Sequence, residues 1–358
     1  MTSPNPHVAT MAPYALAELT VAPGVQLISL SQNESLRAPS PLAIQAAVRA
    51  FENTAEYPDP DWTDLCEAIS QVLGLSMDSI LCGAGSMELI NAIVRAYAGP
   101  GDHVLAPEYT YAFFRTMAQV AQADYRTAAE TDLTVSVQAL LAAVEPQTRI
   151  VCVANPGNPT GTSIPAADLR FLRAQLPTDV LLIVDEAYGE FIPKSKPLFD
   201  LVEQGSTIIL RTFSKAYGLA GMRVGWGCFP PEIAAQTRKL LNPNNISAAS
   251  QAAATAAMLD QDYMRDTCTR TIALRESFTR SCRALGLKVP DSHTNFILIQ
   301  FASSATAKSA DRYLRQHGIL MRGMGGYGLP DCLRATIGPV QIMDTTIKCL
   351  KHWQAKET

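Results

Sequence analysis

A lysine and an arginine follow one apolar run at a spacing that suits a phosphate-bearing aldehyde. Lys215 comes shortly after residues 208–210, and Arg223 lies eight positions further along. The lysine amine can form a Schiff base with an aldehyde. The guanidinium, together with the hydroxyls of Thr212 and Ser214, can hold a phosphate. The pattern therefore predicts a site for a ligand that carries both groups.

A carboxylate that could complete this site ends another apolar run, residues 180–184. Asp185 would be costly to bury there without a partner, and a pyridinium nitrogen is a suitable one. Tyr188, three positions later, could donate to a phenolate oxygen of the same ring. Pyridoxal phosphate has all four groups, so we expect it as the cofactor. The alternative is that Asp185 pairs with an arginine elsewhere in the chain.

Three further segments offer polar contacts after predicted strands. Turn-forming residues crowd positions 155–161, where the Asn158 amide could donate to the phenolate oxygen. The small residues 83–86 precede a helix whose free N–H groups favour a phosphate, although an ordinary turn would look the same. Arg334 lies inside an apolar strand, which suggests either a substrate carboxylate or a structural ion pair as its partner.

The elements that must position these residues alternate between strands and helices from about residue 41 to 240. This alternation predicts an α/β fold with a mostly parallel sheet covered on both faces. Ligands in such folds bind outside the carboxyl ends of the strands, where these motifs occur. We predict strands at 79–82, 103–106, 149–154, 180–184, 207–210, 224–228, 295–300 and 333–337, and helices at 87–97 and 246–258.

Length and composition exclude several classes of protein. With 358 residues, 47% of them hydrophobic, the chain suits two packed domains. The net charge of −4 argues against nucleic-acid binding, and no apolar run is long enough to span a membrane. We read no signal peptide. Eight scattered cysteines and five histidines without metal spacing predict no metal site and a cytosolic location.

Together these motifs resemble those of the fold-type I pyridoxal-phosphate enzymes, and among them the class I/II aminotransferases. The resemblance is greatest to the histidinol-phosphate aminotransferase family and extends over nearly the whole chain. It implies an N-terminal arm (1–40) on the small domain and partner subunit, a large cofactor-binding domain (41–243) with a seven-stranded sheet, and a small C-terminal α/β domain (244–358). The matching segments are residues 57–61, 83–86, 158–161, 185–191, 214–221 and 327–330 leading to Arg334.

The resemblance also implies a role for each matched residue. Lys215 would hold the cofactor and move the substrate proton, Asp185 would pair with the ring nitrogen, and Tyr188 and Asn158 would hold the phenolate oxygen. Tyr109 would stack on the ring, and Arg334 would bind the substrate carboxylate. The phosphate would be held by Ala84, Gly85, Ser86, Thr212, Ser214, Arg223 and the neighbouring subunit's Tyr57.

The implied reaction is ping-pong transfer of an amino group to 2-oxoglutarate by a homodimer with shared active sites. Tyr14 and Arg322 match positions that bind a substrate phosphate, which favours histidinol phosphate and a role in histidine biosynthesis (EC 2.6.1.9). Residues 33–41 differ from the family's Asn-Glu-Asn-Pro-aromatic-Gly-Pro-Ser-Pro segment, and Arg37 adds a charge there. Met87 and Glu108 replace the Asp and Thr that are more usual in their motifs. An aromatic or other amino-acid donor therefore stays open.

Two kinds of protein with other functions resemble the same family. A decarboxylase of the threonine-phosphate type keeps the same lysine, aspartate and arginine, so its products must distinguish it. The aminotransferase-like effector domain of a transcription regulator would follow a DNA-binding domain. About 40 residues precede the first helix–strand unit, too few for such a domain and its linker.

Overall fold

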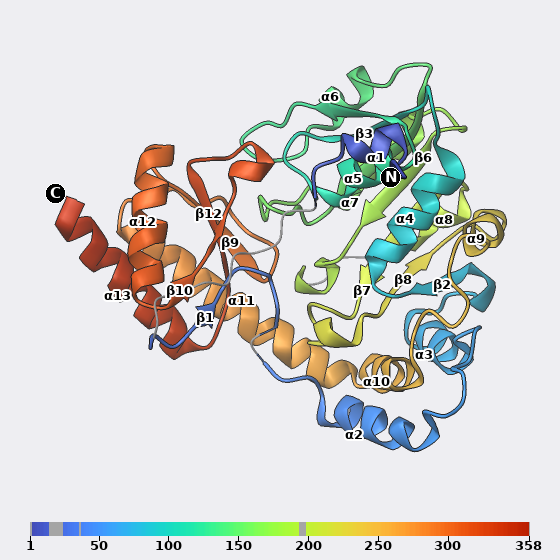
Figure 1. Ribbon diagram of the computed structural model, residues 1–358, viewed down its shortest axis with the longest axis horizontal. Helices are drawn as coiled ribbons and strands as arrows, with labels where there is room; N and C mark the ends of the chain where they lie inside the picture. Colours follow the sequence, from blue (N-terminus) through green and yellow to red (C-terminus); the bar gives the residue numbers. More distant parts are fainter. Residues whose placement is uncertain (1, 14–23, 36, 193–197, 358) are drawn as a thin grey trace.

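The computed structural model describes residues 2–13, 24–35, 37–192 and 198–357. Figure 1 shows a larger and a smaller α/β unit side by side, with the long helix α11 (Gln261–Ala284) running between them. In the described part of the chain, no helix is both long enough and apolar enough to cross a membrane.

The larger unit is built on a seven-stranded sheet with the strand order β2-β8-β7-β6-β5-β3-β4. Only β8 runs antiparallel to its neighbours in this sheet, which confirms the mostly parallel sheet that the sequence predicted. The strands are β2 (Ile80–Gly83), β3 (His103–Pro107), β4 (Asp124–Ala128), β5 (Thr148–Ala154), β6 (Leu181–Asp185), β7 (Thr207–Thr212) and β8 (Gly225–Cys228).

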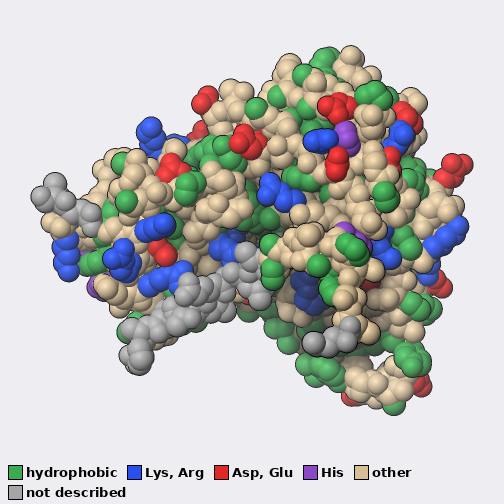
Figure 2. All heavy atoms as spheres, turned by 45° about the horizontal axis from the view of Figure 1, so that its top comes forward, with side chains coloured by type: hydrophobic (Ala, Val, Ile, Leu, Met, Phe, Trp, Pro, Cys, Tyr) green, Lys and Arg blue, Asp and Glu red, His purple; other side chains and the backbone are tan. Residues whose placement is uncertain are grey.

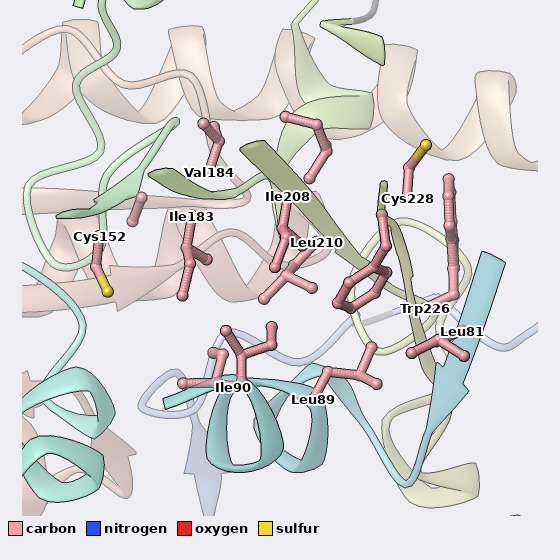
Figure 3. Close-up of a cluster of buried hydrophobic side chains, with 14 of the residues drawn as sticks. Leu81, Leu89, Ile90, Cys152, Ile183, Val184, Ile208, Leu210, Trp226 and Cys228 are labelled. Atoms are coloured by element: carbon pink, nitrogen blue, oxygen red, sulfur yellow. The ribbon is translucent and has the colours of Figure 1, made fainter. Parts of the chain in front are cut away.

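The central strands are apolar along almost their whole length because helices cover both faces of the sheet. Helix α4 (Ser86–Tyr97) carries Leu89 and Ile90, which are fully buried. Figure 3 shows these two side chains pointing from α4 toward Ile183 and Leu210 of the sheet. This packing fixes the N-terminus of α4 at the carboxyl ends of the strands.

The other helices of this unit are short, and one of them lies beyond the predicted domain boundary. Helix α10 packs on α2 and α3, with Ala253 and Ala257 buried in the larger core. Helix α11 contributes to both cores, because Cys268 belongs to the larger core and Phe278 to the smaller one. The boundary after residue 243 stays a prediction. The helices are α2 (Pro41–Ala50), α3 (Thr63–Leu73), α5 (Phe113–Val120), α6 (Val137–Ala142), α7 (Ala166–Gln175), α8 (Phe199–Glu203), α9 (Pro231–Arg238) and α10 (Ala248–Leu259).

The smaller unit has a three-stranded antiparallel sheet, β11-β12-β9, covered by helices. The N-terminal segment joins it: after α1 (Pro6–Ala9), β1 (Ile28–Ser29) pairs in parallel with β10 (Ile319–Leu320), and Leu30 enters the smaller core. The remaining elements are β9 (Phe296–Gln300), β11 (Arg322–Gly323), β12 (Cys332–Thr336), α12 (Ser304–Gln316) and α13 (Val340–Glu357).

The contact between β8 and the start of α4 leads to a first prediction. A Cβ atom at Gly225 would lie 2.2 Å from the backbone nitrogen of Ser86. We expect Gly225→Ala to push the two elements apart and to lower the free energy of unfolding by about 1–3 kcal/mol, measured by urea denaturation. Gly221→Ala is the matched control, because a Cβ there meets no atom within 4 Å. Equal stability of the two variants would contradict this close contact.

Candidate active site

A cavity of about 330 Å³ opens where the carboxyl ends of the larger sheet face the smaller unit. It brings together most of the residues that the sequence singled out, although they are spread over about 250 positions of the chain. Those that line it are Ser86, Asn158, Asp185, Tyr188, Thr212, Ser214, Lys215 and Arg223 from the larger unit, and Arg322 and Arg334 from the smaller one.

Lys215 is half-buried in this cavity, in the turn that follows β7. Its Nζ donates to the backbone oxygen of Gln32 at 3.3 Å. Burial, helped by the positive charge of Arg334, lowers the pKa of Lys215 to about 8, whereas the Glu34 carboxylate acts in the opposite direction. A lysine with such a pKa is largely unprotonated in mildly alkaline solution, as a nucleophile or base must be.

Asp185 ends β6 on the floor of the cavity and is 4% exposed. One carboxylate oxygen accepts the Ala187 N–H at 3.0 Å. Burial, with a smaller effect from the Glu186 charge, raises the pKa of Asp185 to about 6. Among the described residues no arginine pairs with Asp185, unlike in the alternative considered from the sequence. A cationic ring nitrogen would stabilise its charged form.

Tyr188 and Asn158 each keep a donor for a ligand oxygen. The Tyr188 hydroxyl oxygen accepts a hydrogen bond from Asn33 Nδ2 at 2.9 Å, so its own hydrogen remains to donate. Burial raises the pKa of Tyr188 to about 12, which keeps the phenol protonated. Asn158 Oδ1 accepts from Arg334, which leaves the amide nitrogen of Asn158 as the donor.

The N-terminus of α4, two hydroxyls and a guanidinium form a cradle for an anion. Arg223 donates to Ser214 Oγ at 3.4 Å, and Thr212 Oγ1 donates to the same hydroxyl at 3.0 Å. A Cβ at Gly85 would lie 2.4 Å from Arg223 Nη2, so only glycine lets the guanidinium approach the helix so closely. Helix N–H groups beside a guanidinium suit a phosphate.

Four predicted cofactor residues do not line the cavity, and three of them, Ala84, Gly85 and Tyr109, lie in loops that contribute other residues to it. The Ala84 N–H donates to Glu88 Oε2 at 2.6 Å and the Gly85 N–H to Gly83 O at 2.7 Å, so in this loop Ser86 is the predicted residue that lines the cavity. Tyr109 packs in a small cluster near Tyr327, and Tyr111 of the same loop lines the cavity instead. Stacking by Tyr109 remains a prediction.

Other singled-out residues lie further away or outside the described part. Tyr57 is 89% exposed on the outer surface, and Tyr14 lies outside the described residues. Met87 lines the cavity, whereas Glu108 is exposed. Arg37 turns to α11, where it bonds to the Asp266 and Thr267 side chains at 2.8 and 2.9 Å.

Residues 31–34 all line the cavity, but sequence reasoning used Asn33 and Glu34 only as part of a family segment and named none of the four as a site residue. Ser31 O accepts from Arg334 at 2.9 Å, Gln32 O accepts from Lys215, and Asn33 holds Tyr188. Asn33 has a φ of 55°, a left-handed conformation that asparagine tolerates better than most residues. An asparagine in a segment rich in turn formers was the signal available.

The fold and the site define an α/β enzyme whose lysine, aspartate and phosphate cradle fit pyridoxal phosphate. The model of the family "Aminotransferase class I and II" matches residues 25–348. The chain belongs to this family of pyridoxal-phosphate-dependent aminotransferases.

Individual proteins of known sequence or structure are also similar to this chain. The chain is 40% identical to a histidinol-phosphate aminotransferase of Paramagnetospirillum magneticum and 41% identical to one of Rhodospirillum centenum, each over 98% of both chains. A solved structure of histidinol-phosphate aminotransferase from Sinorhizobium meliloti in complex with pyridoxal-5'-phosphate has a TM-score of 0.91. Its sequence is 29% identical, and the match covers 100% of this chain and 99% of that one.

The shifted pKa of Lys215 gives a second prediction. With a pKa of about 8, roughly half of this amine is free at pH 8 in the cofactor-free enzyme. Acylation of Lys215 with trace acetic anhydride, followed by mass spectrometry across pH, should have its midpoint near that pH. Exposed Lys351 is the internal reference, and Arg334→Gln should move the Lys215 midpoint upward because one repelling charge is gone. Identical profiles for Lys215 and Lys351 would contradict the burial argument.

Proposed function

We propose that the chain transfers the amino group of histidinol phosphate to 2-oxoglutarate in a ping-pong reaction. The observation that carries this proposal is a pair of arginines. Arg322 of β11 and Arg334 of β12 are cross-strand partners, and both line the cavity. Like charges directly opposite one another destabilise a sheet, and an anion in contact with both guanidinium groups would offset their repulsion. A dianionic phosphate ester suits two guanidinium groups.

The acceptor fits the same arginines, because 2-oxoglutarate is also a dianion. A donor that carried only one carboxylate would need a single guanidinium. The histidinol-phosphate aminotransferases similar to this chain support the same donor. Tyr14, expected at the substrate phosphate, remains part of this proposal.

The side chains of the cavity divide the work of the reaction. Pyridoxal phosphate, when bound, supplies an aldehyde that links to amines and a ring that withdraws electrons from the donor Cα. The Asp185 carboxylate accepts a hydrogen bond from the protonated ring nitrogen. Tyr188 and Asn158 donate to the phenolate oxygen. Lys215 Nζ takes the proton from the donor Cα and delivers it to C4′, the aldehyde carbon of the cofactor. Arg334 and Arg322 orient the donor by its anionic end.

A homodimer with shared sites also belongs to the proposal. Tyr57 is 89% exposed, and Leu42, Val48 and Phe51 of α2 and the following turn are 54, 61 and 59% exposed. Figure 2 shows hydrophobic side chains along the lower edge of the molecule, where α2 lies in Figure 1. Apolar side chains exposed together favour a protein interface there, and Tyr57 would reach the neighbouring active site.

Removal of Arg322 tests the donor. In Arg322→Ala, kcat/KM for histidinol phosphate should fall roughly 10- to 100-fold, the effect of one charge-assisted hydrogen bond. Phenylalanine, tyrosine and leucine as donors should change much less, since they lack a phosphate. The assay follows glutamate formation from 2-oxoglutarate, and the cofactor absorbance confirms that the variant is loaded.

Three outcomes of the same screen count against the proposed donor. Equal losses for all donors would mean that Arg322 binds no phosphate. Good turnover of an aromatic donor without turnover of histidinol phosphate would make the chain an aromatic aminotransferase. Release of carbon dioxide without a 2-oxo acid would identify a decarboxylase.

Mixing two defective variants tests the shared site. Lys215→Ala lacks the base, and Tyr57→Ala lacks the proposed contact across the dimer. If the sites are shared, a hybrid dimer contains one site with both native residues. We expect the refolded mixture to be more active than the mean of the two separate variants. No gain in activity, in a mixture shown to contain hybrid dimers, would mean that Tyr57 serves its own subunit or none.

A further inference from the structure

A buried ion triad lies behind the cavity, on the opposite face of β7. Arg211 stands between Leu210 and Thr212, so the strand's alternation points its side chain away from the site. Its Nε and Nη2 donate to Glu186 Oε2 at 3.0 and 2.7 Å, and its Nη1 lies 3.6 Å from Glu190 Oε1. These three side chains are only 11, 10 and 4% exposed.

The two carboxylates of the triad belong to the segment that carries Asp185 and Tyr188. Glu186 directly follows Asp185, and Glu190 comes two positions after Tyr188. The segment turns sharply through hydrogen bonds from Gly189 N–H to Glu186 O at 2.9 Å and from Phe191 N–H to Tyr188 O at 3.0 Å. The guanidinium therefore holds the segment at both ends of this turn.

The triad also sets the charge beside Asp185. A buried carboxylate without a compensating cation is strongly unfavourable, and removal of one partner of a buried pair exposes that penalty. The Glu186 charge already disfavours ionisation of Asp185, and Arg211 is the cation bound to it. A neutral Asp185 could not stabilise a protonated ring nitrogen.

We propose that Arg211 is a positioning residue for the cofactor ring. By binding Glu186 and Glu190 it fixes residues 185–190, and by cancelling the neighbouring charge it lets Asp185 meet the ring nitrogen as a carboxylate. The inference rests on the assignment of pyridoxal phosphate and is independent of the amino donor.

The test compares two ligands on cofactor-free enzyme at about pH 8, by fluorescence titration. One is pyridoxal phosphate, and the other is its carbocyclic analogue, in which a CH group replaces the ring nitrogen. The analogue keeps the aldehyde, the phenol and the phosphate, so only the contact with Asp185 differs. In Arg211→Met the affinity for pyridoxal phosphate should fall roughly tenfold more than that for the analogue, which corresponds to one unit in the pKa of Asp185.

Two further variants and a control keep the test specific. Arg211→Lys keeps the positive charge and should retain most of the preference for pyridoxal phosphate over the analogue. Glu186→Gln removes the negative charge next to Asp185 and should increase that preference. Arg173→Met is the matched control, because Arg173 is a buried arginine of the same unit that bonds to backbone oxygens such as Val180 O at 2.7 Å. It should leave the preference unchanged even if it lowers stability.

If Arg211→Met lowered the affinity for both ligands equally, the triad would have only a structural role and the proposal would be overturned. So would a loss of preference in Arg173→Met as large as that in Arg211→Met. A native enzyme that binds both ligands equally would overturn the proposal together with the role of Asp185. The donor screen with Arg322→Ala tests the substrate separately, so failure of one leaves the other standing.

Discussion

A carboxylate at the buried end of a strand needs a cation, and the site is arranged around this requirement at Asp185. Its side chain is 4% exposed and receives one backbone N–H bond, so its charged form depends on what binds in the cavity. Because β6 and β7 are parallel neighbours, the turn after β7 brings Lys215 to the same edge of the sheet. The aspartate and the lysine thus reach the same cavity from adjacent strands.

Local sequence was sufficient to predict the strands β6 and β7, whose carboxyl ends lie at the cavity. Asp185 and Lys215 each follow an apolar run that ends at the cavity, so their location follows from strand prediction alone. The edge strand β4 was missed because only Ala128 of its five residues is buried, which leaves no continuous apolar run to recognise. The sheet order could not be derived from periodicity, since pairing joins segments far apart in the chain.

The contacts that residues 31–34 make in the cavity could not be predicted, because their partners are distant in sequence. Asn33 contacts Tyr188 and Thr336, about 155 and 303 positions away, and no pattern within the segment encodes these contacts. Arg37 shows the same limit. Its charge suggested an effect on the substrate, which stays a prediction; the motif did not indicate that its guanidinium stacks on Tyr263 at 4.0 Å and bonds to α11. A side chain's direction depends on tertiary contacts that a motif does not contain.

The site is divided between the two units, and this division separates the proposed cofactor contacts from the proposed contacts with the substrate anion. Asp185, Lys215 and the phosphate cradle belong to the larger unit, whereas Arg322 and Arg334 stand on adjacent strands of the smaller one. Residues 28–34 connect them, because β1 extends the smaller unit and Gln32 O accepts from Lys215. If these residues act as proposed, changes in the smaller sheet would alter which anion is recognised while the ring contacts stay the same.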